Sequence, residues 1–186
     1  PSGLDALPDR VHGVPLDLDD SASVDACAAA VLATLGGLDV LVNNAGVLGF
    51  RGPLLDAPPE DVERTLAVNL TGTLRLTRAL VPAIPHGGAV VNVSSGAAGR
   101  PGWAGYAVSK AALDAASAVM RAELAGAGIR VIAVNPGGLR TEMRAAAYPG
   151  EDQTTLPPPE SIAPLFVAIA AGDDPGAYVD AREWAA

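Results

Sequence analysis

Residues 88–110 read GAVVNVSSGAAGRPGWAGYAVSK, and this stretch decides the fold class. It opens with the apolar run Gly88–Ser95, which is typical of a buried strand. A helix is predicted over Trp103–Ala125, and Gly126 and Gly128 end it. A buried strand followed by a long helix is half of a βαβ unit, so the stretch predicts a parallel sheet.

The same alternation continues on both sides of this stretch. Further strands are predicted at Val11–Leu18, Leu38–Val42, Ile129–Val134 and Ala177–Asp180. Further helices are predicted over Ser23–Leu35, from Pro58 to about Val81, and from Glu160 to Ala171, with a proline- and glycine-rich loop from Gly137 to Pro159. The pattern predicts a single α/β domain over residues 1–186, with helices on both faces of the sheet.

Composition excludes several classes of protein. Hydrophobic residues make up 49% of the chain and charged residues 18%, which argues against disorder. A net charge of −9 argues against nucleic acid and anionic membranes as partners, and no apolar run approaches the roughly 20 residues of a membrane span. The single cysteine, Cys27, rules out an internal disulfide, and no set of metal ligands is present. We expect a globular cytoplasmic protein without a metal site.

The pair Tyr106 and Lys110 is the strongest chemical signal. Lys110 is the only lysine, since the other 11 basic residues are arginine. Tyr106 precedes it by four residues, so the two side chains share one helix face. An ammonium nearby lowers the pKa of a phenol from about 10, which suits proton exchange with a carbonyl or alcohol oxygen. An isolated Tyr-x-x-x-Lys is more often a surface pair, but the sole lysine favours a functional pair.

Two polar residues fit the same chemistry. Ser95 ends a predicted strand, 11 residues before Tyr106, and its hydroxyl could hydrogen-bond the same substrate oxygen. A serine that merely closes a turn is the plainer alternative. Asn69 lies on an apolar helical stripe and needs a buried partner, because an unmade hydrogen bond costs about 1–3 kcal/mol. It is either a satisfied core asparagine or the anchor of a water that links Lys110 to solvent.

Taken together, the motifs resemble those of the short-chain dehydrogenase/reductase family. From about Asp17 onward, they occur in the family's order: Asn43-Asn44-Ala45-Gly46, Asn69 in Val-Asn-Leu, Ser95 in Asn-Val-Ser-Ser, Tyr106-x-x-x-Lys110, and Asn135-Pro136-Gly137-x-x-x-Thr141. The resemblance implies a Rossmann-type, doubly wound parallel sheet. It also implies hydride transfer between NAD or NADP and a small carbonyl or secondary alcohol, with Asn69, Ser95, Tyr106 and Lys110 as the catalytic residues.

The resemblance also implies a cofactor site. Lys110 would hold the nicotinamide ribose beside Tyr106, and Asp17 with Leu18 would border the adenine. The middle and the nicotinamide end of the cofactor would contact Asn44, Ala45, Gly46, Pro136, Gly137, Leu139 and Thr141.

Two features depart from the family pattern. The segment between Ser95 and Tyr106 is slightly short, which leaves Ser94 as an alternative to Ser95. The first two strands and the Gly-rich phosphate-binding turn are absent from the sequence, so we expect an N-terminally truncated sheet in which Val11–Leu18 has no neighbour. Either an N-terminal piece is missing from this sequence, which we favour, or the chain is a short variant without the usual phosphate anchor.

Other readings remain open at this level. A catalytically silent interaction module could keep the same residues, whereas a Rossmann-like methyltransferase would give the Tyr106–Lys110 pair no role. Trp103 and Tyr148 are either substrate contacts or packing residues. Opposite Tyr106, the predicted helix carries a small apolar stripe of Val108, Ala112, Ala115 and Val119. The family commonly pairs this helix across a two-fold axis, which predicts a homodimer or homotetramer.

Overall fold

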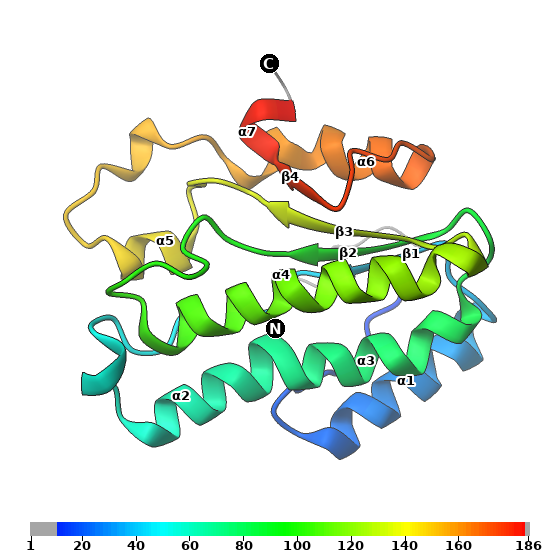
Figure 1. Cartoon of the computed structure of the whole chain (residues 1–186), viewed down its shortest axis with the longest axis horizontal. Helices are drawn as coiled ribbons and strands as arrows, with labels where there is room; N and C mark the ends of the chain where they lie inside the picture. The colour runs from blue at the N-terminus through cyan, green and yellow to red at the C-terminus, as the bar shows by residue number, and fades with distance from the viewer. Residues whose placement is uncertain (1–10, 185–186) are drawn as a thin grey trace.

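The computed structural model describes residues 11–184 and places a parallel sheet between two layers of helices (Figure 1). The strands are β1 (Val40–Asn43), β2 (Ala89–Val93), β3 (Arg130–Asn135) and β4 (Tyr178–Asp180). The helices are α1 (Ser21–Leu35), α2 (Pro59–Leu66), α3 (Thr73–Leu80), α4 (Ala104–Leu124), α5 (Glu142–Ala147), α6 (Ala163–Ala171) and α7 (Ala181–Trp184). The strands lie in the order β1-β2-β3-β4, and each neighbouring pair is parallel. The predicted α/β class is confirmed.

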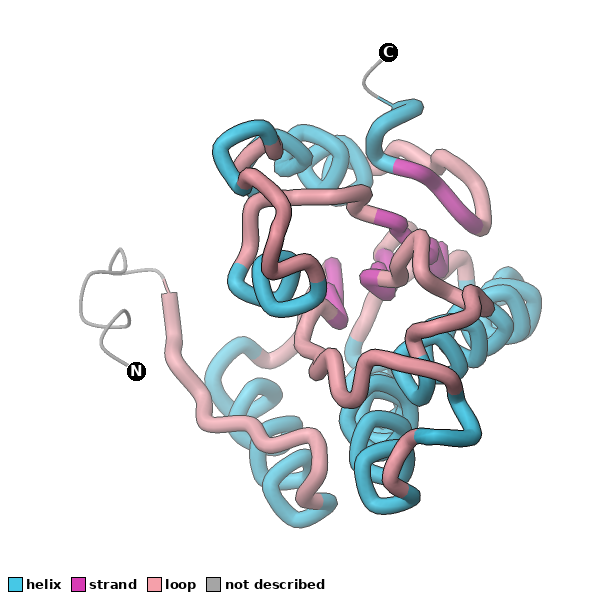
Figure 2. Tube along the Cα trace, turned by 90° about the vertical axis from the view of Figure 1, so that its left-hand side faces the viewer, coloured by secondary structure: helices cyan, strands magenta, loops and turns pink. Residues whose placement is uncertain are grey.

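The central strand β2 is buried on both faces, which explains its unbroken apolar run. Val90 faces a core formed with α1 and α3, where Val24 and Leu80 are almost fully buried. Val91 faces the opposite core, formed largely by Leu165 and Ile169 of α6. Figure 2 shows the strands between these two helix layers. Because each such side chain contributes about 1.5–3 kcal/mol on burial, the two cores hold the carboxyl ends of the strands in place.

The predicted strand at Val11–Leu18 is wrong. None of the described strands pairs with this segment, and a strand needs a neighbour for its backbone groups. The segment runs as coil toward α1, where the Asp17 N–H donates to Ser23 Oγ at 2.9 Å. The outer edge of β1 is accordingly unpaired among the described residues, as the truncated sheet predicts.

Two further segments differ from the sequence prediction. The long helix from Pro58 to Val81 is interrupted by a π-helical turn at Ala67–Gly72, where Thr73 Oγ donates to the carbonyl of Val68 five residues earlier, at 3.2 Å. The predicted loop from Gly137 to Pro159 contains α5, whose N-cap Thr141 accepts from the Arg144 N–H at 3.1 Å. Neither of these side-chain hydrogen bonds can be read from hydrophobic periodicity.

Candidate active site

The carboxyl ends of β1, β2 and β3 open into one cavity of about 630 Å³. The polar residues after each strand line it, as parallel sheets favour. The predicted site residues that contribute are Asn44, Ala45, Gly46, Ser94, Ser95, Tyr106, Lys110, Pro136, Gly137, Leu139 and Thr141. Segments that are far apart in the sequence thus meet at one edge of the sheet.

Tyr106 and Lys110 reach this cavity from the first turns of α4. The Tyr106 and Lys110 residues are 7% and 4% exposed, and Lys110 Nζ lies 5.8 Å from the centroid of the Tyr106 ring. The ammonium donates to the carbonyl oxygen of Val93 at 2.7 Å, which fixes it at the end of β2. One face of α4 therefore presents a phenol and a buried cation to the same space.

Burial controls the ionisation of both groups. It lowers the pKa of Lys110 to about 8, while the negative charge of Asp114 opposes this fall. Burial raises the pKa of the Tyr106 phenol, and the nearby Ser95 hydroxyl opposes that rise. The expectation of a lowered phenol pKa is therefore wrong, because desolvation raises the pKa and Lys110 is not among the groups that shift it.

The two serines after β2 occupy different environments. The Ser95 side chain faces Tyr106, and its oxygen accepts from the Ala97 N–H at 3.1 Å. Ser94 is 2% exposed, faces Asp114 instead, and its Oγ has no hydrogen-bond partner of good geometry among the described residues. This placement favours Ser95 over Ser94 as the hydroxyl that acts with Tyr106.

Asn69 lies in the π-helical turn and is fully buried. Its Oδ1 accepts from the Val47 N–H at 2.8 Å, and its Nδ2 donates to the Val47 carbonyl at 2.9 Å and to Ser109 Oγ at 3.1 Å. The Asn69 side chain thus holds the loop after β1 through its hydrogen bonds to Val47, and it does not itself line the cavity. A Cβ at Gly46 would lie 3.0 Å from Asn69 Oδ1 and 3.6 Å from Lys110 Nζ, so a glycine allows all three to approach.

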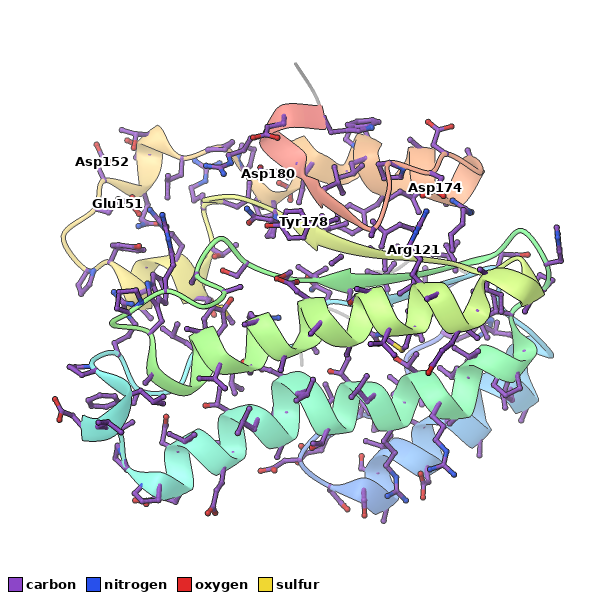
Figure 3. The ribbon with its side chains drawn as sticks, in the orientation of Figure 1. Arg121, Glu151, Asp152, Asp174, Tyr178 and Asp180 are labelled. Carbon is purple, nitrogen blue, oxygen red and sulfur yellow. The ribbon has the colours of Figure 1, made fainter. Side chains whose placement is uncertain are left out.

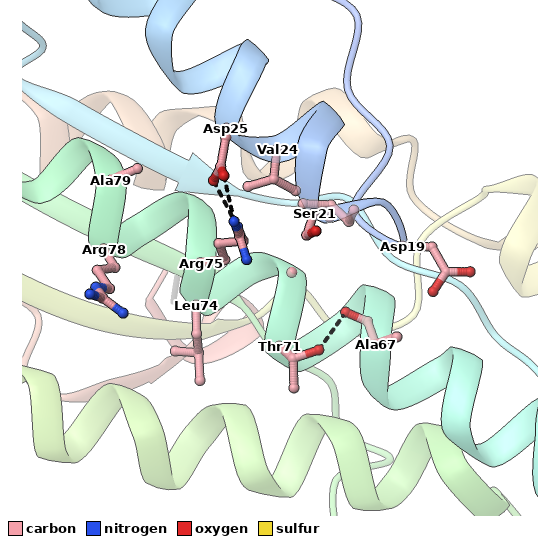
Figure 4. Close-up of a pocket in the computed structure, with 12 residues that line it drawn as sticks. Asp19, Ser21, Val24, Asp25, Ala67, Thr71, Leu74, Arg75, Arg78 and Ala79 are labelled. Carbon is pink, nitrogen blue, oxygen red and sulfur yellow. Dashed lines mark hydrogen bonds and ion pairs between the residues drawn. The ribbon is translucent and has the colours of Figure 1, made fainter.

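Asp17 and Leu18 are not brought to the cavity. Leu18 lines a separate hollow of about 750 Å³ between α1 and α3, shown in Figure 4, where Asp25 and Arg75 pair across the opening. Asp17 precedes it on the coil before α1. Their predicted contact with the adenine stays a prediction.

Several residues of the site were missed by sequence reasoning. Asp114 lies eight residues after Tyr106, so the helical period that pairs Tyr106 with Lys110 could have found it. Arg51 and Arg144 join Trp103 and Tyr148 at the cavity mouth, and no motif signals these contacts. The remaining lining is apolar and comes largely from Leu48, Met143, Ala147, Ile162 and Phe166.

A family model of short chain dehydrogenases matches residues 2–152 of this sequence. The chain belongs to the short chain dehydrogenase family. It is 39% identical over 141 residues to the uncharacterized oxidoreductase YciK of Escherichia coli K12, covering 74% of this chain and 55% of that protein. It is 37% identical to the 2-(R)-hydroxypropyl-CoM dehydrogenase of Xanthobacter autotrophicus, covering 74% and 58%. The chain thus spans little more than half the length of these curated relatives.

Solved structures of the family give the same picture. A short chain dehydrogenase of Salmonella enterica serovar Typhi superposes with a TM-score of 0.84 at 34% identity, covering 90% of this chain and 72% of that one. A short chain dehydrogenase of Escherichia coli CFT073, crystallised with NADPH, superposes with a TM-score of 0.82 at 35% identity, covering 90% and 73%.

Within residues 11–184, none of the helices has the length and apolar character needed to cross a membrane.

Proposed function

We propose that the protein carrying this chain is an NAD(P)-dependent oxidoreductase that interconverts a small carbonyl compound and a secondary alcohol. The observation that carries this proposal is the convergence of Tyr106, Ser95 and Lys110 on one cavity. The names of the family relatives, which include oxidoreductases and dehydrogenases, support the same reaction class.

Each residue has a role that its position supports. The Tyr106 phenol is protonated at neutral pH, as an ordinary phenol is, and burial raises its pKa further. It gives its proton to the substrate oxygen during reduction and takes it back during oxidation. Ser95 donates a second hydrogen bond to that oxygen and polarises the carbonyl. Asn69 positions the loop that carries Gly46, so it is a positioning residue here.

The residues present fit the nicotinamide end of a dinucleotide. When bound, this cofactor supplies or accepts the hydride. Lys110 has donors to spare beyond its bond to Val93 and would hold the ribose hydroxyls, and Gly46 and Gly137 line the same cavity. The structures of family members with NADP and NADPH support this choice of cofactor. A silent interaction module would give no reason to bury a lysine charge, which is costly.

Two further features belong to the proposal. The stripe of α4 opposite Tyr106 leaves Val108 39% and Val119 55% exposed, which supports a homodimer or homotetramer built on this helix. The cytoplasm is the proposed location, from composition and charge alone.

The reaction is tested with Tyr106→Phe and Lys110→Arg, assayed with NADH and NADPH. Removing the phenol proton should lower turnover by about 10²- to 10⁴-fold. Lys110→Arg should also fail, because a planar guanidinium cannot replace a compact ammonium. Tyr178→Phe is the matched control, because Tyr178 lies on β4 outside the cavity. Near-normal rates in Tyr106→Phe would refute the assignment.

A further inference from the structure

One wall of the cavity is held by an interlocked group of side chains at its mouth, here called the Trp103 cluster and formed by Arg51, Trp103, Arg144, Tyr148 and Glu151. Trp103 lines the cavity, and its ring centroid lies 5.9 Å from that of Tyr106. The edge of Tyr148 meets Trp103 at 5.7 Å between centroids, with an interplanar angle of 63°. The Trp103 indole therefore lies beside the Tyr106 phenol and also packs against Tyr148.

The backbone also fixes this indole. Ala104, the residue after Trp103, has φ of +38° and is the one non-glycine residue with positive φ in the part of the chain that the structure describes. Such a conformation is unfavourable for a residue with a Cβ, and it persists only where surrounding contacts impose it. Strain of this kind gathers at functional sites. Ala104 is the first residue of α4 and lies between Trp103 and Tyr106 in the sequence.

The Trp103 cluster contains two arginines, and an arginine with a free charge could bind an anionic substrate. Arg144 places its guanidinium 3.8 Å from the centre of the Tyr148 ring and binds both carboxylate oxygens of Glu151, at 2.6 Å each. Figure 3 shows Glu151 on the loop that follows α5. The charge of Arg144 is therefore compensated within the cluster.

Arg51 is occupied in a different way. Its guanidinium lies 3.6 Å from the centroid of the Trp103 ring, and its Nη1 donates to the Gly102 carbonyl at 2.8 Å. Arg51 is not among the residues that line the cavity, whereas Trp103 is. Arg51 thus clamps the indole and presents no charge to a bound substrate. Among the described residues that line the cavity, the cations are Lys110 and Arg144. The proposed function assigns Lys110 to the cofactor, and Glu151 compensates the charge of Arg144.

Much of the cavity that Trp103 lines is apolar surface, from Leu48, Met143, Ala147, Ile162 and Phe166. We propose that the site takes an uncharged ketone or secondary alcohol bearing a flat apolar ring, packed against Trp103, and that it rejects keto acids. This inference rests on the proposed function for its reaction and adds the substrate class. Aromatic contacts add to the burial of apolar area, whereas a carboxylate would be buried here beside cations whose charges are already taken, Arg144 by Glu151 and Lys110 by the proposed cofactor.

Binding can be tested without turnover, because the chain has two tryptophans. Trp184→Phe leaves Trp103 as the only indole, and Trp103→Phe leaves Trp184, which is 38% exposed and outside the cavity, as the matched control. Four carbonyl probes vary the aromatic ring and the charge independently. Acetophenone has the ring alone, phenylglyoxylate has the ring and a carboxylate, pyruvate has a carboxylate alone, and acetone has neither. Acetophenone should quench the fluorescence of Trp103 in a saturable way, and the other three should quench it only linearly.

The control variant should show linear quenching with all four probes. Saturable binding of phenylglyoxylate or pyruvate as tight as that of acetophenone would overturn the inference. So would the absence of saturable quenching of Trp103 by acetophenone.

Turnover gives the second measurement. The ratio of kcat/KM for acetophenone to that for acetone should fall about 10- to 100-fold in Trp103→Ala. Arg51→Met should raise KM for acetophenone and change kcat much less, because it loosens the indole and leaves Tyr106 in place. An unchanged ratio in Trp103→Ala would overturn the inference. If acetophenone binds at Trp103 but no probe is reduced, the proposed reaction fails and the binding preference stands.

Discussion

At the scale of single residues, Lys110 is a buried cation, and burying a charge costs free energy. The residue is 4% exposed, and burial lowers its pKa to about 8 from the ordinary 10.5. The one acid that opposes this fall is Asp114, one helical turn further along α4. Other groups near Lys110 include the Val93 carbonyl and the Tyr106 ring, neither of which carries a negative charge at neutral pH.

Because the chain has a single lysine, the titration of Lys110 can be observed in isolation. Protein labelled with ¹³Cε-lysine should give one lysine signal in NMR spectra, titrating near pH 8. Asp114→Asn should move the titration to lower pH, because it removes the compensating charge. Asp25→Asn, a surface change on α1, is the control and should leave it unchanged. A lysine that titrates near 10.5 would contradict the burial of the ammonium.

The same shift predicts how stability depends on pH. The folded chain releases the Lys110 proton near pH 8 and the unfolded chain near 10.5, so between these values the unfolded state binds more protons. The free energy of unfolding should therefore gain about 3 kcal/mol from this group as the pH rises from 8 to 10.5. Urea unfolding of the wild type and Lys110→Met isolates this contribution. The variant should be the more stable at pH 7, and the difference should shrink as the pH rises; a difference that grows would contradict the account.

Sequence alone predicts the centre of the site but not its surroundings. Tyr106 and Lys110 are found by their spacing, and Ser95 by its place at the end of a strand, because these signals are local. Trp103 and Tyr148 could be named only as substrate contacts or packing residues. Their roles depend on Arg51, which is far away in the sequence and meets Trp103 only in the folded chain.

At the scale of elements, the buried strands are predicted best. β1, β2 and β3 form from apolar runs, and their bounds differ from the prediction by only one or two residues. Val11–Leu18 has the same kind of sequence but no strand beside it, so it does not form one. Hydrophobic pattern reports a tendency to extend, whereas a strand also needs a partner.

The contact between this coil and the π-helical turn gives a test at this scale. A Cβ at Gly72 would lie 2.1 Å from the carbonyl oxygen of Leu18, which is backbone and cannot move aside easily. Gly72→Ala should therefore destabilise the chain by about 1–3 kcal/mol in urea unfolding. Gly126→Ala is the matched control, because nothing lies within 4 Å of its added Cβ, and it should be neutral or slightly stabilising. Equal stability of the two variants would show that the coil is not held against this turn.

At the scale of the whole molecule, the exposed stripe of α4 predicts self-association. Val108, Ala115 and Val119 lie on the surface of the monomer, on the side of the helix away from the cavity. Ala115→Arg should place like charges in a two-fold contact and split the assembly, as measured by light scattering. Ala29→Arg, at an exposed position on α1, is the control. A wild type that is monomeric at micromolar concentration would contradict the proposed dimer or tetramer.

Cofactor affinity is a second property of the whole chain. The 186 residues contain no Gly-rich turn after an apolar strand, and that turn is the usual anchor of the pyrophosphate. Calorimetry on this polypeptide should therefore give dissociation constants for NADH and NADPH weaker than the micromolar range. A micromolar value for either would mean that another part of the chain holds the phosphates.

Transfer of deuterium from NADPH labelled at C4 of the nicotinamide tests the proposed reaction most directly. The chain is incubated with millimolar labelled cofactor, in each C4 stereochemical form, and with acetone, cyclohexanone and acetophenone together, so that weak binding is overcome. Mass spectrometry should find at least one product alcohol with a single deuterium at the carbinol carbon, and Tyr106→Phe should yield about 10²- to 10⁴-fold less of it. No labelled alcohol, or equal amounts from the wild type and Tyr106→Phe, would contradict hydride transfer assisted by this tyrosine.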